Sequence, residues 1–252
     1  MTAIATRPAP IRALGAIVGY TLRSALPGKR WLAALVPAAM SVMFGLIATT
    51  LPESADRAFA AVASNALFTL ILPVTCLVVG DAVLGAEVRS GTFVFTWMSP
   101  VPTWQIAVGR WLGGTIAAGS MIAVAFALSA VVAGASSTAG AAAVAGAFGA
   151  GAYLAVFIAI GCITKRAAVW SIAFVFLFER LLGAALAGIA QISPSWEARA
   201  AFVGLTDVRE DLEREGIPEG SGALVRLALV TAIALLLANS RLRSLKLTGS
   251  AD

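Results

Sequence analysis

Long apolar stretches dominate this chain and restrict it to a membrane-spanning fold. Six of them are long enough to cross a bilayer, for which a helix needs about 20 mainly apolar residues. Hydrophobic residues make up 60% of the 252 positions and charged residues 12%, far from the mix of an ordinary globular domain. The sequence therefore predicts an all-α polytopic membrane protein with six transmembrane helices, at residues 31–51, 61–84, 105–134, 141–163, 167–190 and 223–239.

Basic residues collect in alternate connections between these stretches. By the positive-inside rule, the richer side is cytoplasmic, which places both termini and the 85–104 connection inside and the 191–222 connection outside. Anionic lipid at the inner face accounts for the net charge of +5, so no nucleic acid is expected as a partner. The richer side holds Arg7, Arg12, Arg23, Lys29, Arg30, Arg89, Arg110, Lys165, Arg166, Arg241, Arg243 and Lys246; the other holds Arg57, Arg199, Arg209, Arg214 and Arg226.

The chain is expected to form one transmembrane domain without separate globular parts. Residues 1–30 would contain a cytoplasmic interfacial helix, 31–240 the six-span bundle and 241–252 a cytoplasmic tail. Within 11–26, apolar residues recur at helical spacing while Arg12 and Arg23 share a different face. This pattern is typical of a helix that lies flat on a membrane surface. The alternative is an undirected basic tail.

Several kinds of chemistry are excluded by the residues that are missing. The chain contains no histidine, which removes His-based triads and His metal sites. It also lacks the G-x-x-x-x-G-K-[ST] phosphate-binding loop. Cys76 and Cys162 lie in or beside apolar stretches, where small packing roles are more common than disulfides or metal sites. We therefore expect no metal, no cofactor and no catalytic residue in this chain.

The connection between the second and third apolar stretches carries the most specific pattern. It contains Glu87 and Arg89, a Ser-Gly break, an aromatic stretch and a Pro-x-Pro stop. The pattern indicates a short helix or turn that its aromatic residues hold at the membrane surface, with both charges available to a soluble partner. An ordinary interfacial loop remains an equal alternative on these grounds.

At this point the chain resembles the membrane subunits of ABC type-2 exporters, the permease family. The resemblance lies in an acidic-x-Arg-x-Gly-Thr run, a Ser-Pro-Val turn and the start of the third span. In this sequence these are Glu87-x-Arg89-Ser90-Gly91-Thr92, Ser99-Pro100-Val101 and Trp104-Gln105-Ile106-Ala107-Val108-Gly109-Arg110. Val94 stands where an acidic residue is common in the family. The six-span plan and the N-terminal interfacial helix extend the similarity over most of the chain.

The resemblance implies a permease subunit of an ATP-driven exporter in a bacterial inner membrane. Its 85–104 connection would be the coupling helix that docks on a separately encoded ATPase. Two ATPase subunits, which bind ATP and Mg, and a second permease subunit, identical or homologous, would complete the complex. The cargo would be a hydrophobic or amphipathic compound, drug-like, antibiotic-like or lipid. The implied coupling residues are Glu87, Arg89, Ser90, Gly91, Thr92, Phe93, Trp97, Ser99 and Pro100.

Glu179 and Arg180 are charges deep within the fifth apolar stretch. Each costs at least about 2.5–3.5 kcal/mol to insert at such depth, so both should face protein or water and be paired. Because consecutive helical residues point about 100° apart, they are expected to find partners elsewhere. They are interpreted either as part of the translocation path or a subunit interface, or as a structural buried ion pair.

Small residues and turn signals supply two further predictions. Gly109 with Gly113, and the glycines at 146, 149 and 151, favour close helix packing, more often within a bundle than in a dimer interface. Between the last two spans, Asp207 and Glu210 form a capping box for a short helix that ends near 216–218. By the family resemblance, residues 193–205 could re-enter the outer leaflet.

Two other classes of protein stay open. The first is an ion-coupled secondary transporter that uses Glu179, which paired broken helices in inverted repeats would support. The second is a membrane enzyme or assembly subunit without transport. The scarcity of intramembrane acids and the missing histidine weigh against catalysis.

Overall fold

The structure, a computed structural model, is mainly helical in the residues that it describes, which are 10–25, 30–85, 101–164, 166–206, 208 and 218–244. Four helical rods in these ranges are long and apolar enough to cross a membrane: Ala55–Val83, Thr103–Val132, Ser136–Ile163 and Ser221–Ser244. A shorter apolar helix covers Leu35–Ala48. The expected all-α class is therefore confirmed, with four helices able to span a membrane. The count of six crossings stays a prediction.

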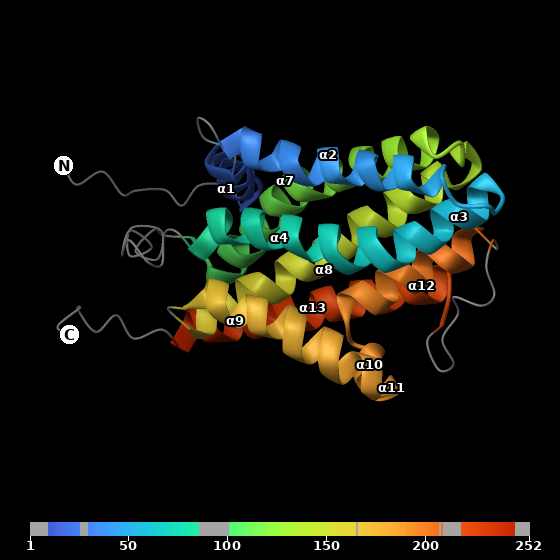
Figure 1. The fold of residues 1–252 in the computed structure, drawn as a ribbon. Coiled ribbons are helices and arrows are strands. Elements are labelled where there is room, and N and C mark those ends of the chain that lie inside the picture. The colour runs from blue at the N-terminus through green and yellow to red at the C-terminus, as the bar shows by residue number, and fades with distance from the viewer. Residues whose placement is uncertain are drawn as a thin grey trace, which may run out of the picture.

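Helix α1 (Pro10–Ala25) crosses one end of the bundle and does not run along it as α2 (Arg30–Ala48) does (Figure 1). Its inner face packs against α7, while Ile11, Arg12 and Arg23 are exposed. An amphipathic helix in this orientation suits the surface of a membrane whose normal runs along the bundle. In the same view α1 and the last turn of α13 lie at one end.

The second apolar stretch forms one rod with changes of helical pitch. It consists of α3 (Ala55–Val62), the π-helical segment η1 (Ala63–Ile71), α4 (Leu72–Gly80) and a second π-helical segment, η2 (Asp81–Gly85). The rod runs beside α2 and α8.

The third and fourth stretches form a hairpin. Helix α7 (Thr103–Val132) ends where Gly134 takes a φ of 79°. There the Gly134 N–H bonds to the Val131 carbonyl and the Ala135 N–H to the Ala130 carbonyl, the two bonds of a Schellman motif. The short 3-10 turn η3 (Ser136–Thr138) then leads into α8 (Ala139–Ile163).

Helix α8 is the centre of the bundle, because α4, α7, α12 and α13 all pack on it. Its glycines allow this. A Cβ atom added at Gly146 would lie 2.8 Å from Ile122 Cγ2, and one at Gly149 would lie 2.9 Å from Ala198 Cβ. The expectation that these glycines pack within the bundle is confirmed. Beside them, the rings of Phe68, Phe126 and Phe202 fill the core.

The fifth apolar stretch differs from its prediction as one uninterrupted helix. Helix α9 (Ala167–Ala173) and the π-helical segment η4 (Phe174–Leu182) are followed by the short helices α10 (Gly183–Ala185) and α11 (Ala187–Ala190), which turn away from the bundle (Figure 1). Leu186 between them has an extended backbone.

Helix α12 (Pro194–Thr206) then returns and packs along α8 at Ala198, so this part of the predicted external segment belongs to the bundle. Helix α13 (Ser221–Ser244) runs back to the end that holds α1, and it continues four residues into the predicted tail. The predicted capping box at Asp207 and Glu210 lies outside the described residues.

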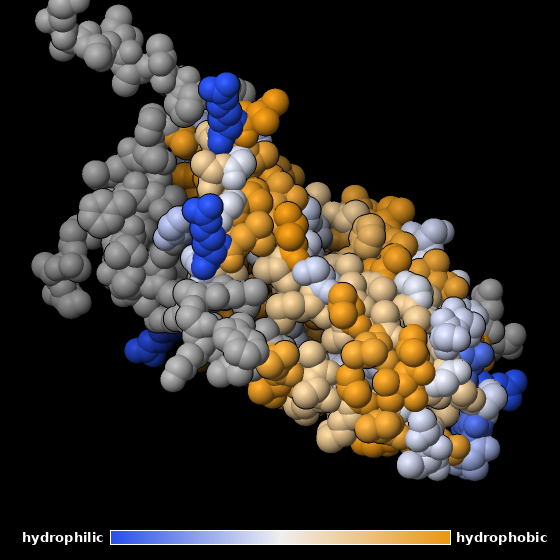
Figure 2. All heavy atoms as spheres, turned by 90° about the horizontal axis from the view of Figure 1, so that it is seen from above, coloured by the Kyte–Doolittle hydropathy of each residue, from blue (hydrophilic) through white to orange (hydrophobic). Residues whose placement is uncertain are grey.

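The surface fits a bilayer. Seen from the side of α1 and α2, apolar atoms cover the middle of the molecule and hydrophilic residues lie towards its two ends (Figure 2). Large apolar side chains such as Val124, Ile233 and Leu236 are about two-thirds exposed, which is favourable only against hydrocarbon.

Candidate functional site

Glu179 lies at the break in the fifth stretch and is almost fully buried, with 1% of its surface exposed. Its carboxylate accepts hydrogen bonds from the hydroxyl of Tyr153 and, at 2.5 Å, from the hydroxyl of Ser193. The hydroxyl and the backbone N–H of Ser195 each donate to Oε1 at 3.2 Å. Every group around this carboxylate is a donor, so the cluster is built to hold a negative charge.

Ser193 and Ser195 lie at the N-terminus of helix α12, and this position explains why their partner is an acidic side chain. The first backbone N–H groups of a helix have no partner within it, and the helix dipole places partial positive charge there. Pro194, which has no N–H, occupies the first helical position. Glu179, on η4, therefore caps α12 from across the break. Tyr153 joins the cluster to the middle of α8.

Arg180 has a different partner, the backbone carbonyl of Thr69 on η1. In a regular α-helix this carbonyl would accept the N–H of residue 73, which is a proline and has none. Unpaired carbonyls are costly in a membrane protein, and the guanidinium supplies a donor where Pro73 cannot. Arg180 thus connects η4 to the π-helical part of the second stretch.

Neighbouring charges Glu179 and Arg180 therefore act on separate contacts. The structure places no ion pair between them; each is bound to groups on other elements. Both lie on η4, and π-helical segments often occur where function requires a side chain to be turned from the regular register.

Glu197 is a second buried acid that the sequence analysis did not single out. It lies on the first turn of α12 and is fully buried. Neither carboxylate oxygen accepts a hydrogen bond within the described part of the chain, and the nearest cation is the Arg226 guanidinium on α13, 3.7 Å away. The apolar residues Ala198, Ala201 and Phe202 on the same helix are buried with it, and this pattern was the available signal.

Arg110 organises the opposite, predicted cytoplasmic, end. It lies on α7, is 2% exposed, and donates to the carbonyl of Val83 near the end of the second rod at 3.0 Å. Its guanidinium also lies over the ring of Tyr20 on α1, 4.9 Å from the centroid. Close by in sequence, the hydroxyl of Thr103 donates to the Asn239 side chain on α13 at 2.8 Å.

The predicted coupling residues between these anchors lie outside the described residues. These are Glu87, Arg89, Ser90, Gly91, Thr92, Phe93, Trp97, Ser99 and Pro100. The structure describes only the two ends of their connection, η2 on one side and the start of α7 on the other.

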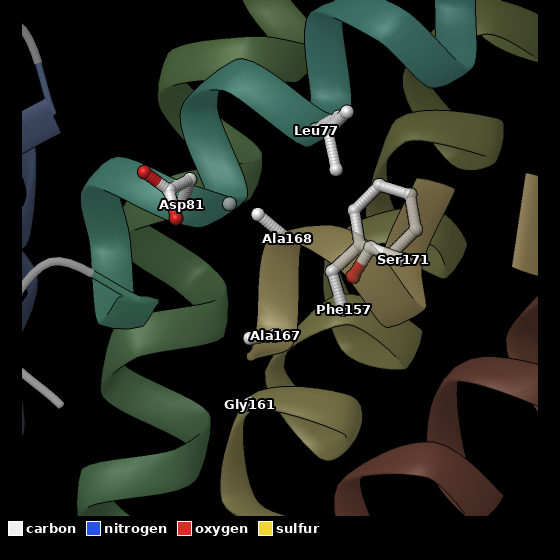
Figure 3. Close-up of a pocket in the computed structure, with 8 residues that line it drawn as sticks. Leu77, Asp81, Phe157, Gly161, Ala167, Ala168 and Ser171 are labelled. Carbon is white, nitrogen blue, oxygen red and sulfur yellow. The ribbon is translucent and has the colours of Figure 1, made fainter. Parts of the chain in front are cut away.

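A small pocket lies beside the same end, between the second rod, α8 and α9 (Figure 3). Asp81, Phe157 and Ser171 line it, and Leu77 and Ala168 narrow it. The space is about that of one water molecule. Within the described ranges no three His, Cys, Asp or Glu side chains come together as metal ligands. Cys76 and Cys162 are buried and unbridged, as expected for packing residues.

No protein-family profile and no curated protein matches this sequence.

Proposed function

We propose that this chain is the permease subunit of an ATP-driven ABC type-2 exporter that moves a hydrophobic or amphipathic compound, drug-like, antibiotic-like or lipid, out of the cytoplasm or the inner leaflet. Two separately encoded ATPase subunits would bind ATP and Mg, and a second permease copy or homologue would complete the complex. Both termini would be cytoplasmic in a bacterial inner membrane, with six crossings. The chain itself would carry no catalytic residue.

The anchoring of Arg110 is the observation that supports this proposal most. One side chain joins α1, the end of the second rod and α7, at the two ends of the connection that carries the Glu87-to-Pro100 pattern. The bond between Thr103 and Asn239 extends the link to α13. A push on this connection by a soluble partner would therefore reach four elements of the bundle. This is the property that a coupling segment requires.

The test is co-purification followed by mutation of the connection. The tagged chain, expressed with its neighbouring genes, should yield an ATPase in equal stoichiometry. In that complex Glu87→Ala and Arg89→Ala should leave the amount of folded protein nearly unchanged, since surface substitutions usually cost less than about 0.5 kcal/mol, while transport falls sharply. Gly91→Val should act similarly if its turn needs glycine. Wild-type transport and ATPase stimulation in all three variants would refute a coupling role.

An ion-coupled secondary transporter is the second candidate, and one observation favours it. The fifth stretch is a broken helix, and Glu179 on η4 accepts a hydrogen bond from the N-terminus of the next long helix, α12. Broken helices with polar groups at the break form ion sites in several secondary transporters. The donors around Glu179 suit an anion more than a cation, which weighs against this reading.

Reconstitution separates the two candidates. Proteoliposomes that contain only this chain should show no transport when a proton or sodium gradient is imposed. Gradient-driven transport that Glu179→Gln abolishes would favour the secondary transporter and overturn the exporter proposal.

A further inference from the structure

A long apolar groove follows the lipid-exposed side of the bundle between α2 and α7. Its volume is about 610 Å³, compared with about 10 Å³ for the pocket beside Asp81. Apolar side chains line it almost completely, and Ser120 is the polar exception. The lining residues are Leu35, Ala38, Ala39, Val42, Ser120, Met121, Val124, Ala125 and Leu128.

The groove lies beside the point where α2 and α7 approach most closely, on the side of that point towards α1. At that point the Ser129 hydroxyl donates to the Ser41 carbonyl at 2.6 Å. A Cβ atom at Gly45 would lie only 2.4 Å from the Ser129 carbonyl oxygen, so glycine is required for this approach. From Ser120 to Leu128 the open part extends about 12 Å along α7, at 1.5 Å per residue.

A second, smaller pocket continues the groove inwards. It shares Ala38, Met121 and Ala125 with the groove and reaches Pro37 and Thr75 between α2 and the second rod. The inner space is only about 10 Å³, so it extends the groove by little more than the volume of one water molecule, and both spaces are apolar.

Basic residues lie beyond the groove at the end where α1 packs. Thr21 contacts α7 at Gly113, where an added Cβ would lie 2.6 Å from Thr21 Cβ. Gly113 precedes Ser120 by seven residues, about 10 Å of helix. Arg23 follows Thr21 by two positions and is exposed, and α1 contains no acidic residue. Only residues 26–29 separate α1 from α2.

We propose that this groove binds the acyl chain of an anionic phospholipid-like amphiphile, with its headgroup at the basic face of α1. The apolar lining takes hydrocarbon, and Arg23 attracts the anionic head. As an entry point for cargo, the groove rests on the proposed exporter function. As a binding site it does not, and it is tested without any ATPase.

The test is photolabelling of the full chain in phosphatidylcholine nanodiscs. The probe is phosphatidylglycerol with a diazirine in its acyl chain, and labelled residues are identified by peptide mass spectrometry. Labels should concentrate on Val124, and on the less exposed Met121, over Ile233 and Leu236 of α13, which are as exposed as Val124 but lie outside the groove. Equal labelling of all four residues would overturn the proposal.

Matched variants test the chain site and the head site separately. Ala39→Trp, which fills the groove, should abolish the enrichment, whereas Val36→Trp on the same helix but outside the groove should not. Val124→Trp fills the groove from α7 if Ala39→Trp does not fold. Arg23→Gln should reduce labelling about fivefold, the effect of one basic residue near an anionic surface.

Three other outcomes would contradict the proposal. Equal labelling by a phosphatidylcholine probe with the same acyl chain would show that binding does not depend on an anionic headgroup. If labelling of the groove residues stays enriched in both groove-filling variants, the acyl chain binds elsewhere. Disulfide cross-links between copies through Ala39→Cys, in a background without Cys76 and Cys162, would make a second copy the occupant.

Discussion

At the scale of single residues, the adjacent charges Glu179 and Arg180 stabilise contacts between different pairs of helices. Glu179 caps α12 and binds Tyr153 of α8, whereas Arg180 donates to the carbonyl of Thr69, four residues before Pro73. Removing one group from such a site leaves its buried partners unsatisfied, which typically costs about 1–3 kcal/mol or more. These two residues therefore should not compensate for one another when both are replaced.

We expect the losses from Glu179→Gln and Arg180→Met to add. Each single variant should lower the thermal midpoint of the purified protein, and the double variant should lower it by about the sum, because the two side chains share no hydrogen-bond partner. Arg57→Met, at an exposed arginine, is the control. Recovery of stability in the double variant would show that the two residues form an ion pair after all.

Loss of Arg226 should be more harmful than loss of its acidic partner. Arg226→Met leaves Glu197 buried without its nearest cation, whereas Glu197→Gln leaves a partly exposed arginine that water can reach. Thermal unfolding should therefore occur at a lower temperature in Arg226→Met than in Glu197→Gln. The reverse order would mean that Glu197 makes favourable contacts of its own.

At the scale of elements, the π-helical segments and the glycine contacts determine how the helices meet. Segment η1 ends shortly before Pro73, and Arg180 on η4 donates a hydrogen bond to the Thr69 carbonyl of η1. Glycines on α7 let α1 lie against it, and glycines on α8 let three neighbours approach. In a membrane, where apolar association contributes little, this backbone proximity is what holds helices together.

The link between Pro73 and Arg180 can be measured with a double-mutant cycle. Pro73→Ala restores an N–H that can bind the Thr69 carbonyl, so Arg180→Met should cost less in this background than in the native one. Couplings between residues that share a partner range over about 0.5–3 kcal/mol. Thermal unfolding of the four proteins gives the value. A coupling near zero would exclude the shared carbonyl as the reason for Arg180.

The packing of α1 against α7 can be tested at Gly109. A Cβ atom there would lie 2.7 Å from Ile17 Cγ2, so Gly109→Ala should displace α1, and Ile17→Ala should restore part of the contact. Gly140→Ala, where nothing lies within 4 Å, is the matched control. Proteolysis of α1 at the membrane surface reports its displacement. Equal protection of all four proteins would contradict this packing.

At the scale of the whole molecule, the bundle has two chemically different ends. One end carries α1 and the last turn of α13, with Arg241 and Arg243; the other carries the turn at η3 (Figure 1). Arg241, Arg243 and the amphipathic helix α1 thus lie at the same end, which agrees with the prediction that this end is cytoplasmic.

Single-cysteine labelling tests this orientation. In a background without Cys76 and Cys162, an impermeant maleimide should reach Ser137→Cys and Ser221→Cys in intact cells, and Ser244→Cys only after permeabilisation. All three serines are exposed. Ser195 is unsuitable because it is buried beside Glu179. Labelling of Ser244→Cys in intact cells would reverse the orientation.

The sequence by itself determined the helical membrane class and most helix limits. An apolar run of sufficient length specifies a helix because every backbone hydrogen bond is then made locally. The predicted third span at 105–134, for example, lies within two residues of α7 at both ends. Only the tertiary structure decided where the fifth stretch breaks, that Glu197 is buried, and which groups Glu179 and Arg180 bind. Their partners lie on α8, η1 and α12, and local periodicity carries no information about hydrogen bonds between segments that meet only when the bundle is packed.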